Sequence, residues 1–307
     1  ALWEIFSRLQ QRLQEGALFT PAMIFAAATE ELRKNGDSPF DHAVVDEAQD
    51  VNVQQLRFLA ALAGDRPDGL FFAGDLGQRI LQTPFSWKSL GVDVRGRSST
   101  LRINYRTSHQ IRSQADRLLD AEIADVDGNV ESRRNAVSVF NGPEPEVRLF
   151  PTEADEIAAI GQWIRDRITD GMAAEEIGVF VRSSGQVTRA REAIRAAGLE
   201  PTAPAPGVDP EPGKVVLLPM HLAKGLEFRA VVVAACDDEV LPLQSRIEEV
   251  TDDADLEEVY NTERHLLYVA CTRARDRLLV TAVKPGSEFL GDLATVTPER
   301  SKSHRIA

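Results

Sequence analysis

Apolar residues at helical spacing open the chain and predict two helices. In the first helix they recur every three or four positions, at Leu2, Ile5, Phe6, Leu9 and Leu13, and Gly16 follows as a stop signal. The second helix is predicted to begin at Thr20 and Pro21, because threonine is a favoured cap and proline suits the first turn. It is expected to end near residues 34–36.

Short apolar runs then alternate with helical segments, which is typical of parallel strands in an α/β sheet. Before residue 100, strands are predicted at 42–47 and 69–75, with a helix over about 52–63. After residue 100, strands are predicted at 100–105, 146–150, 177–181, 214–219, 230–235 and 277–282. The helices among them are predicted over about 108–119, 152–169, 185–197 and 263–275.

The strands are unevenly divided along the chain. The part after residue 100 has enough of them for a complete doubly wound sheet, whereas the part before it has two. We therefore predict a partial first domain over 1–97, a complete second domain over 98–290 and a flexible tail over 291–307. Within the second domain, 125–145 is expected to be a polar loop, and the proline-rich 201–213 a stiff, exposed connector.

Composition places the chain among ordinary soluble proteins. Of its 307 residues, 43% are hydrophobic and 27% are charged. No run approaches the ~18 apolar residues of a membrane span, and the first residues lack the basic start of a secretory signal, so we expect a cytoplasmic protein. Cys236 and Cys271 lie in apolar surroundings without metal-like spacing, which indicates buried reduced thiols.

Charge is segregated along the chain. The net charge of −13 argues against a surface coated with nucleic acid, but it leaves room for a local basic channel. The segment 95–112 contains arginines and no acidic residue, whereas 246–263 is strongly acidic. The basic stretch 95–102 could attract phosphates, and it could equally be a solvated linker.

A cluster of carboxylates follows the first predicted strand, in the stretch "VVDEAQD" (44–50). Asp46, Glu47 and Asp50 would repel one another unless water or a cation lay among them. The carboxyl end of a buried strand is where open α/β sheets bind ligands, and an Asp-Glu pair there fits hydrolysis of a Mg²⁺–nucleotide. Acids that favour the dipole at a helix start are the alternative, which these residues alone leave open.

Four further segments accompany this stretch in a fixed order: "AGDLGQRI" (73–80), "LRINYRTSHQI" (101–111), "MHLAKGLEF" (220–228) and "ERHLLYVACTRARDRL" (263–278). Together the five resemble motifs II to VI of the UvrD/Rep-like branch of superfamily 1 DNA helicases. The resemblance covers about residues 40–282. It implies a RecA-like P-loop NTPase fold, with motifs II and III in the first domain and motifs IV to VI in the second.

The resemblance also implies residues for ATP hydrolysis. Asp46 would coordinate Mg²⁺, Glu47 would be the catalytic base, and Gln78 would sense the γ-phosphate. The second domain would then supply five residues. Tyr105 would pack on the adenine, Arg106 and Arg273 would reach the γ-phosphate, and Glu227 with Gly225 of the same motif would contact the ribose or the phosphates. Planar, permanently charged guanidinium groups suit phosphoryl transfer, and their arrival from the second domain would couple hydrolysis to domain closure.

The resemblance further implies three contacts with single-stranded DNA. Trp87 in "PFSWKSL" would stack on a base, and the alternative is a core tryptophan. His221 would lie near the DNA backbone, and a structural histidine is the alternative. Lys224 would also contact the nucleic acid, although a lysine before glycine is equally consistent with a solvated turn.

The chain departs from the family pattern in two respects. It contains no G-x-x-x-x-G-K-[ST] loop to bind the β- and γ-phosphates, since Gly213-Lys214 leads into a strand rather than out of one. Pro219 and Leu222 stand where the family usually has threonine and serine, which puts the DNA contacts of motif V in doubt. We expect the missing loop and its strand to belong upstream of Ala1.

The sequence therefore predicts the carboxyl-terminal part of an ATP-dependent DNA helicase or translocase that is inactive by itself. A non-catalytic relative that binds DNA or a protein partner is the alternative. The residues do not separate DNA from RNA, or repair from other roles. A partial first domain should also leave an apolar face uncovered, so we expect self-association.

Overall fold

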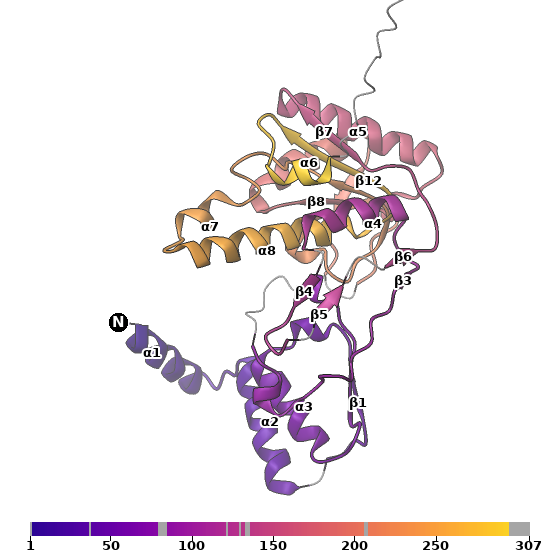
Figure 1. Cartoon of the computed structure of the whole chain (residues 1–307). Helices are drawn as coiled ribbons and strands as arrows, with labels where there is room; N and C mark the ends of the chain where they lie inside the picture. Colours follow the sequence, from indigo (N-terminus) through magenta and orange to yellow (C-terminus); the bar gives the residue numbers. More distant parts are fainter. Residues whose placement is uncertain are drawn as a thin grey trace, which may run out of the picture. The chain divides into compact units, whose positions relative to one another are not determined.

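The computed structural model describes residues 2–36, 38–78, 85–120, 122–128, 130–132, 136–205 and 208–294. The chain forms two compact units, which are drawn with the chain coloured along its sequence in Figure 1. Unit 1 comprises Ala1–Thr100 and Ile123–Glu131, and unit 2 comprises Leu101–Glu122 and Ser132–Ala307. A short segment from within the predicted second domain thus joins unit 1.

Three helices form most of unit 1, and the second of them begins at its predicted cap. They are α1 (Leu2–Glu15), α2 (Pro21–Asn35) and α3 (Val53–Ala63). The Thr20 hydroxyl accepts the N–H of Met23 at 3.2 Å, and Asn52 and Gln55 form a reciprocal capping box at the start of α3. Helices α2 and α3 pack side by side, with an edge-to-face contact between Phe25 and Phe58.

The sheet of unit 1 is a parallel pair, β1 (Ala43–Val45) and β2 (Leu70–Phe72), in which Val44 lies opposite Phe71. The prediction of a buried strand is wrong here, because Val44 is 75% exposed and Phe71 is 63% exposed. Alternate side chains point to opposite faces of a sheet, and the described part of unit 1 leaves the face with Val44 and Phe71 open. A separate pair, β4 (Glu122–Ala124) and β5 (Val130–Ser132), forms a hairpin.

A six-stranded parallel sheet is the centre of unit 2, as predicted. Its order is β7-β12-β11-β8-β10-β9, and all five pairs of neighbouring strands are parallel. The strands are β7 (Glu146–Phe150), β8 (Ile177–Val181), β9 (Glu200–Thr202), β10 (Lys214–Pro219), β11 (Phe228–Val233) and β12 (Ala274–Val283). All five residues of β8 are buried, as a strand covered on both faces requires.

Helices cover both faces of this sheet. On one face lie α5 (Glu153–Thr169) and α6 (Val187–Ala196), whose Ile160, Trp163 and Ile194 share a buried cluster with strand residues. Figure 1 shows α4 (His109–Ala115) and α8 (Asp253–Cys271) on the other side of the sheet from α5. The remaining helices are α7 (Gln244–Glu248) and α9 (Phe289–Leu293).

Two predicted boundaries are wrong, the start of α8 and the start of the tail. Helix α8 begins ten residues before the predicted position, where Asp252 caps it by accepting the N–H of Asp255 at 2.9 Å. The acidic run there suits the positive end of a helix dipole. The predicted tail from 291 also begins too early, because Leu293 belongs to α9 and is fully buried. Residues 295–307 lie outside the described residues.

Two segments expected to be irregular contain strands. The predicted loop 125–145 includes β5 and β6 (Val137–Ser138), and β6 pairs with β3 (Ile103–Asn104). The proline-rich connector begins as β9, which pairs with β10 at the edge of the large sheet. Pro201 is tolerated there because an edge strand has one side without a neighbour. Residues 206–207 of the connector lie outside the described residues.

Both cysteines are buried and reduced, as predicted. Burial raises the pKa of the Cys271 thiol to about 12, and it raises the pKa of Cys236 as well. Among the described residues, no helix combines the length and apolar character that a membrane crossing needs.

Candidate functional site

The first group of candidate residues follows β1 directly. Asp46 is exposed, and its Oδ1 accepts the backbone N–H of Glu47 at 2.8 Å. Glu47 adopts a left-handed conformation, with φ 51° and ψ 41°, which turns the chain from the strand into the 3-10 turn Ala48–Asp50. This conformation costs a residue with a side chain about 1–2 kcal/mol, so neighbouring contacts must hold it.

Gln49 is the side chain that supplies those contacts. It is buried, and its Nε2 donates to Oε2 of Glu47 at 2.5 Å. On the other side its Oε1 accepts the N–H of Asp75 at 3.0 Å, so it links the segment after β1 to the segment after β2. Sequence reasoning missed Gln49, although it lies inside the quoted motif, because nothing local indicates a partner 26 residues away.

Asp75 extends the same hydrogen-bonded group to Gln78. Its Oδ2 accepts the side-chain amide of Gln78 at 2.8 Å, and its Oδ1 accepts the N–H of Gly77 at 2.8 Å. Gly74 leaves room for the link, because a Cβ there would lie 2.5 Å from Oε1 of Gln49. The structure thus brings Asp46, Glu47 and Gln78 together at the carboxyl ends of two parallel strands, where ligands of α/β sheets bind. We call residues Asp46, Glu47, Gln49, Asp75 and Gln78 the carboxylate cluster.

The donor set at this cluster fits one kind of metal binding. Among the described residues, no three His, Cys, Asp or Glu side chains are grouped so as to enclose a metal ion. Mg²⁺ usually keeps several waters and is held by one or two carboxylates together with substrate phosphates. The exposed Asp46 therefore fits an open Mg²⁺–nucleotide site, in which the substrate supplies the remaining oxygen ligands.

The second group lies in unit 2, at the amino ends of β11 and β12. Oδ1 of Asn104 accepts the N–H groups of Arg106 at 2.8 Å and Thr107 at 3.0 Å, which fixes the turn after β3. The Arg106 Nε lies 3.0 Å from Oε2 of Glu227, and both side chains are about half exposed. Tyr105, between the turn residues, is 72% exposed.

Arg273 is the most deeply buried of the candidate residues, at 1% exposure. Its Nε donates to the carbonyl oxygen of Val269 at 3.0 Å and its Nη1 to that of Leu226 at 3.4 Å. The Arg273 carbonyl in turn accepts the N–H of Phe228 at 3.0 Å. Arg106 and Arg273 therefore both contact the loop 224–228, one through Glu227 and the other through its neighbours. The described contacts hold the Arg273 guanidinium inside unit 2.

The loop 220–227 runs from the carboxyl edge of the large sheet to its amino edge, and candidate residues lie at both ends of it. It leaves β10 at Pro219, level with the end of β8, and enters β11 just before Ala230, level with the start of β8. His221 consequently lies at the carboxyl edge of the sheet, and Glu227 lies at the amino edge. Lys224 and Gly225 lie between them, and Gly225 takes φ +77°, which favours glycine.

A buried ion pair adjoins His221 at the carboxyl edge. Glu263 of α8 is fully buried, and both of its oxygens lie 2.5 Å from the guanidinium of Arg182, which follows β8. Arg246 approaches the same carboxylate at 3.1 Å. Partial burial, and then the positive charge of Arg182, lower the pKa of His221. His221 is therefore mostly neutral near pH 7, so it would meet a phosphate by hydrogen bonding rather than by charge.

Trp87 lies in unit 1, just before the 3-10 turn Lys88–Leu90. Its ring contacts that of Phe72 edge to face, with centroids 4.8 Å apart and an interplanar angle of 61°. The side chain is half-buried, in contrast to Trp163, which is 3% exposed inside the core of unit 2. Trp87 is therefore not enclosed as a core tryptophan would be.

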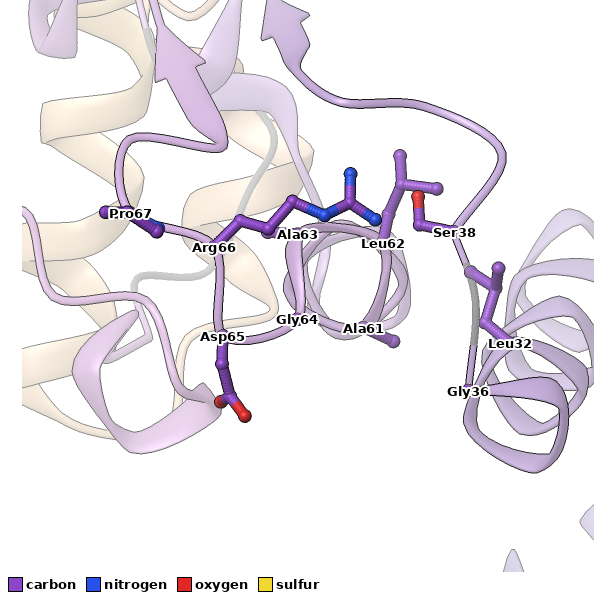
Figure 2. Close-up of a pocket in the computed structure, with 10 residues that line it drawn as sticks. All are labelled: Leu32, Gly36, Ser38, Ala61, Leu62, Ala63, Gly64, Asp65, Arg66 and Pro67. Atoms are coloured by element: carbon purple, nitrogen blue, oxygen red, sulfur yellow. The ribbon is translucent and has the colours of Figure 1, made fainter.

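A cavity of about 350 Å³ lies elsewhere in unit 1. Figure 2 shows its lining, which comes from the end of α2, the end of α3 and the loop that follows α3. Arg66 reaches over it and donates to the carbonyl of Phe40. The end of α2 precedes β1, and the end of α3 with its loop precedes β2. The cavity therefore lies at the amino edge of the parallel pair. It contains none of the candidate residues.

Two family models match the chain. The model described as UvrD/REP helicase N-terminal domain matches residues 5–88, and the model described as UvrD-like helicase C-terminal domain matches residues 205–285. The first contains the carboxylate cluster and the second contains the loop 220–227 and Arg273. The chain belongs to the UvrD-like helicases. The parallel sheet of this UvrD-like protein is accordingly that of a RecA-like α/β fold, as predicted.

Several curated proteins are similar to this UvrD-like chain. A "Probable DNA helicase" of Mycoplasma pneumoniae is 24% identical over 256 residues, which are 79% of this chain and 43% of that protein. An "ATP-dependent DNA helicase UvrD2" of Mycobacterium tuberculosis is 30% identical over 161 residues, 51% of this chain and 23% of that protein. The chain thus spans less than half the length of these relatives.

Among solved structures, the C-terminal domain of a possible DNA helicase from a Lactobacillus is 23% identical. The match covers 62% of this chain and 95% of that one, with a TM-score of 0.43.

Proposed function

We propose that this UvrD-like chain is part of a motor that couples hydrolysis of Mg²⁺–ATP to movement along single-stranded DNA. The observation that carries the proposal is the carboxylate cluster, in which Gln49 and Asp75 hold Glu47 and Gln78 beside Asp46 at the carboxyl edge of a parallel pair. Curated relatives that bear the name ATP-dependent DNA helicase support the same class of reaction.

Three residues of unit 1 would have separate roles at the phosphate: metal binding, proton acceptance and contact with the γ-phosphate. Asp46 would hold Mg²⁺, which when bound neutralises charge on the phosphate oxygens. Glu47 would accept a proton from the attacking water, and its hydrogen bond from Gln49 would orient the carboxylate for that task. Gln78 would donate its amide hydrogen to the γ-phosphate, with Asp75 fixing the direction of the amide.

Unit 2 would contribute positive charge and a stacking surface to the same reaction. Arg106 is half exposed and paired with Glu227. A phosphate could replace the Glu227 carboxylate as its partner, because the guanidinium would still face a negative charge. The exposed ring of Tyr105 would stack on the adenine, and Glu227 with Gly225 would meet the ribose or phosphates. Arg273 would act as a second arginine after leaving the carbonyls that now bind it.

Nucleic acid would be held by Trp87, His221 and Lys224. A half-buried tryptophan anchored on Phe72 can stack on any base, and such stacking is worth ~1–3 kcal/mol per base. His221 would donate one hydrogen bond to the backbone, because its lowered pKa leaves it neutral at pH 7. Lys224 would supply charge to the adjoining phosphate.

We further propose that these 307 residues do not turn over ATP by themselves, because their sequence contains no phosphate-binding loop. The test is ATP hydrolysis by the purified chain, with and without Mg²⁺ and an oligo(dT) strand. No turnover is expected. A longer form that carries such a loop should hydrolyse ATP, and Glu47→Gln in that form should abolish the activity. Turnover by the present chain would overturn the inactivity proposal, and hydrolysis unaffected by Glu47→Gln would overturn the role of the carboxylate cluster.

A further inference from the structure

The turn that carries Trp87 is held by a carboxylate 40 residues away in the sequence, Asp127. Its Oδ2 accepts the backbone N–H of Trp87 at 2.7 Å and that of Lys88 at 3.1 Å. Its Oδ1 accepts the hydroxyl of Ser86 at 2.5 Å. All four residues belong to unit 1, so these contacts lie within one compact body.

These hydrogen bonds satisfy groups that the turn cannot satisfy itself. The first N–H groups of any helical turn lack partners within the turn, and a carboxylate is a strong acceptor for them. The Ser86 hydroxyl oxygen then accepts the N–H of Ser89 at 3.1 Å, so a single carboxylate organises the whole stretch 86–89. The hydrogen bond from Ser86 is the largest cause that lowers the pKa of Asp127, which is accordingly ionised near neutral pH.

The hairpin β4–β5 presents Asp127 at its turn. Oδ1 of Asp125 accepts the N–H of Asp127 at 3.0 Å, and Gly128 takes φ +83°. These local contacts support the turn that carries Asp127. The ring of Trp87 is fixed from another side by Phe72 of β2. Trp87 therefore has its backbone bound to the hairpin and its ring packed on the sheet.

We propose that Asp127 is the positioning residue for Trp87, which it holds in the orientation that stacks on a base of single-stranded DNA. The inference rests on the proposed function of Trp87 and adds the group on which its orientation depends. Asp127 acts through the turn 86–89 and does not itself touch the nucleic acid.

The proposal predicts an effect opposite to that of simple electrostatics. Removing an acidic residue from a protein that binds DNA reduces repulsion of the phosphates, so on charge alone Asp127→Ala should bind DNA more tightly. If Asp127 positions Trp87, the same substitution should weaken binding, because the ring no longer meets the base. Asp93→Ala provides the matched control, since Asp93 is another acid of unit 1 and its hydrogen bonds go to Arg95 instead.

The experiment measures affinity of the full chain for oligo(dT) in a Trp3→Phe background. Trp163 is buried, so acrylamide quenching of fluorescence in this background reports on Trp87. Asp127→Ala is expected to weaken binding roughly tenfold, within the range that loss of one stacked base allows, and to change the quenching of Trp87 without DNA. Asp127→Asn keeps the size of the side chain and replaces one acceptor by a donor, so it should shift both readouts in the same direction even if the alanine variant folds poorly.

A double-mutant cycle separates positioning from a general structural role. In a Trp87→Ala background, Asp127→Ala should have no further effect on binding, since the ring that it positions is gone. An equal loss in both backgrounds, or binding that tightens as in Asp93→Ala, would overturn the proposal. If Trp87→Ala itself leaves binding unchanged, the stacking role of Trp87 fails. The quenching of Trp87 would then still decide whether Asp127 fixes the turn.

Discussion

Unit 1 and unit 2 hold their candidate residues by different means. In unit 2 the inner strand β8 is covered on both faces, and the Arg182–Glu263 pair and Arg273 are buried. In unit 1 the parallel pair exposes Val44 and Phe71, and side-chain hydrogen bonds from Gln49 and Asp75 keep the carboxylate cluster in place. Candidate side chains are therefore held in place by burial in the core of unit 2, and by a few side-chain hydrogen bonds in unit 1. Substitutions should therefore cost more stability in unit 2 than in unit 1.

The largest effect is expected from Glu263→Gln in unit 2. The substitution removes the charge that compensates Arg182 and leaves a buried guanidinium unpaired, which costs about 3–5 kcal/mol of unfolding free energy. Glu200→Gln is the control, because its pair with Arg195 is mostly exposed and should be worth less than about 1 kcal/mol. Urea unfolding followed by circular dichroism measures both. Equal stability of the two variants would show that the buried Arg182–Glu263 pair contributes no more to stability than the exposed Arg195–Glu200 pair.

A smaller effect is expected from Gly74→Ala in unit 1. The added Cβ would lie 2.5 Å from Oε1 of Gln49, so the link between Gln49 and Asp75 must shift, at a cost of about 1–3 kcal/mol. Gly291→Ala is the matched control, since nothing lies within 4 Å of a Cβ at that position. Urea unfolding compares the two variants. A Gly74→Ala protein as stable as Gly291→Ala would mean that the cluster tolerates displacement.

The open face of unit 1 is expected to produce self-association. Val44 and Phe71 are in register on one face of the parallel pair, and exposed apolar patches of this kind favour contact between molecules. Light scattering at increasing protein concentration should show a mass above that of one chain, and Val44→Ser with Phe71→Ser should lower it. A mass equal to one chain at every concentration would refute the expectation.

The smallest effect concerns the pH dependence of unit 2. The pKa of His221 is lowered in the folded protein, so below about pH 6.5 the unfolded chain binds a proton that the folded chain does not. The free energy of unfolding should therefore fall as pH drops through about 6.5 toward the lower pKa of the folded protein, and His221→Gln should lessen this fall. Urea unfolding of both proteins at several pH values is the measurement. Identical pH profiles would show that the surroundings of His221 do not disfavour its charge.

Local signals in the sequence predicted much of the fold. The cap at Thr20 and the apolar run 177–181 each correspond to an element at the predicted place. The start of α8 was missed because an acidic first turn has no apolar spacing. The exposure of β1 was missed as well, because a short apolar run has the same pattern whether its faces are covered or open.

The candidate residues could be named from motifs, but most of their partners could not. Glu227 pairs with Arg106 from a distant part of the sequence, and Asp75 meets Gln49 only when β1 and β2 lie side by side. Asp127 lies in a stretch that looks like an ordinary polar loop, and its role depends on which unit that stretch joins. Such partners are set by chain topology, which local patterns do not contain.

The hairpin that supplies Asp127 also decides how this protein can be divided. Because unit 1 contains both Ala1–Thr100 and Ile123–Glu131, no single cut yields it intact. A chimera that exchanges residues 1–100 between relatives would carry the tryptophan and leave its carboxylate behind. The turn that carries Trp87 therefore depends on two separate stretches of the gene. A change at position 127 has to preserve an acceptor for the Ser86 hydroxyl and for the backbone N–H groups of residues 87 and 88.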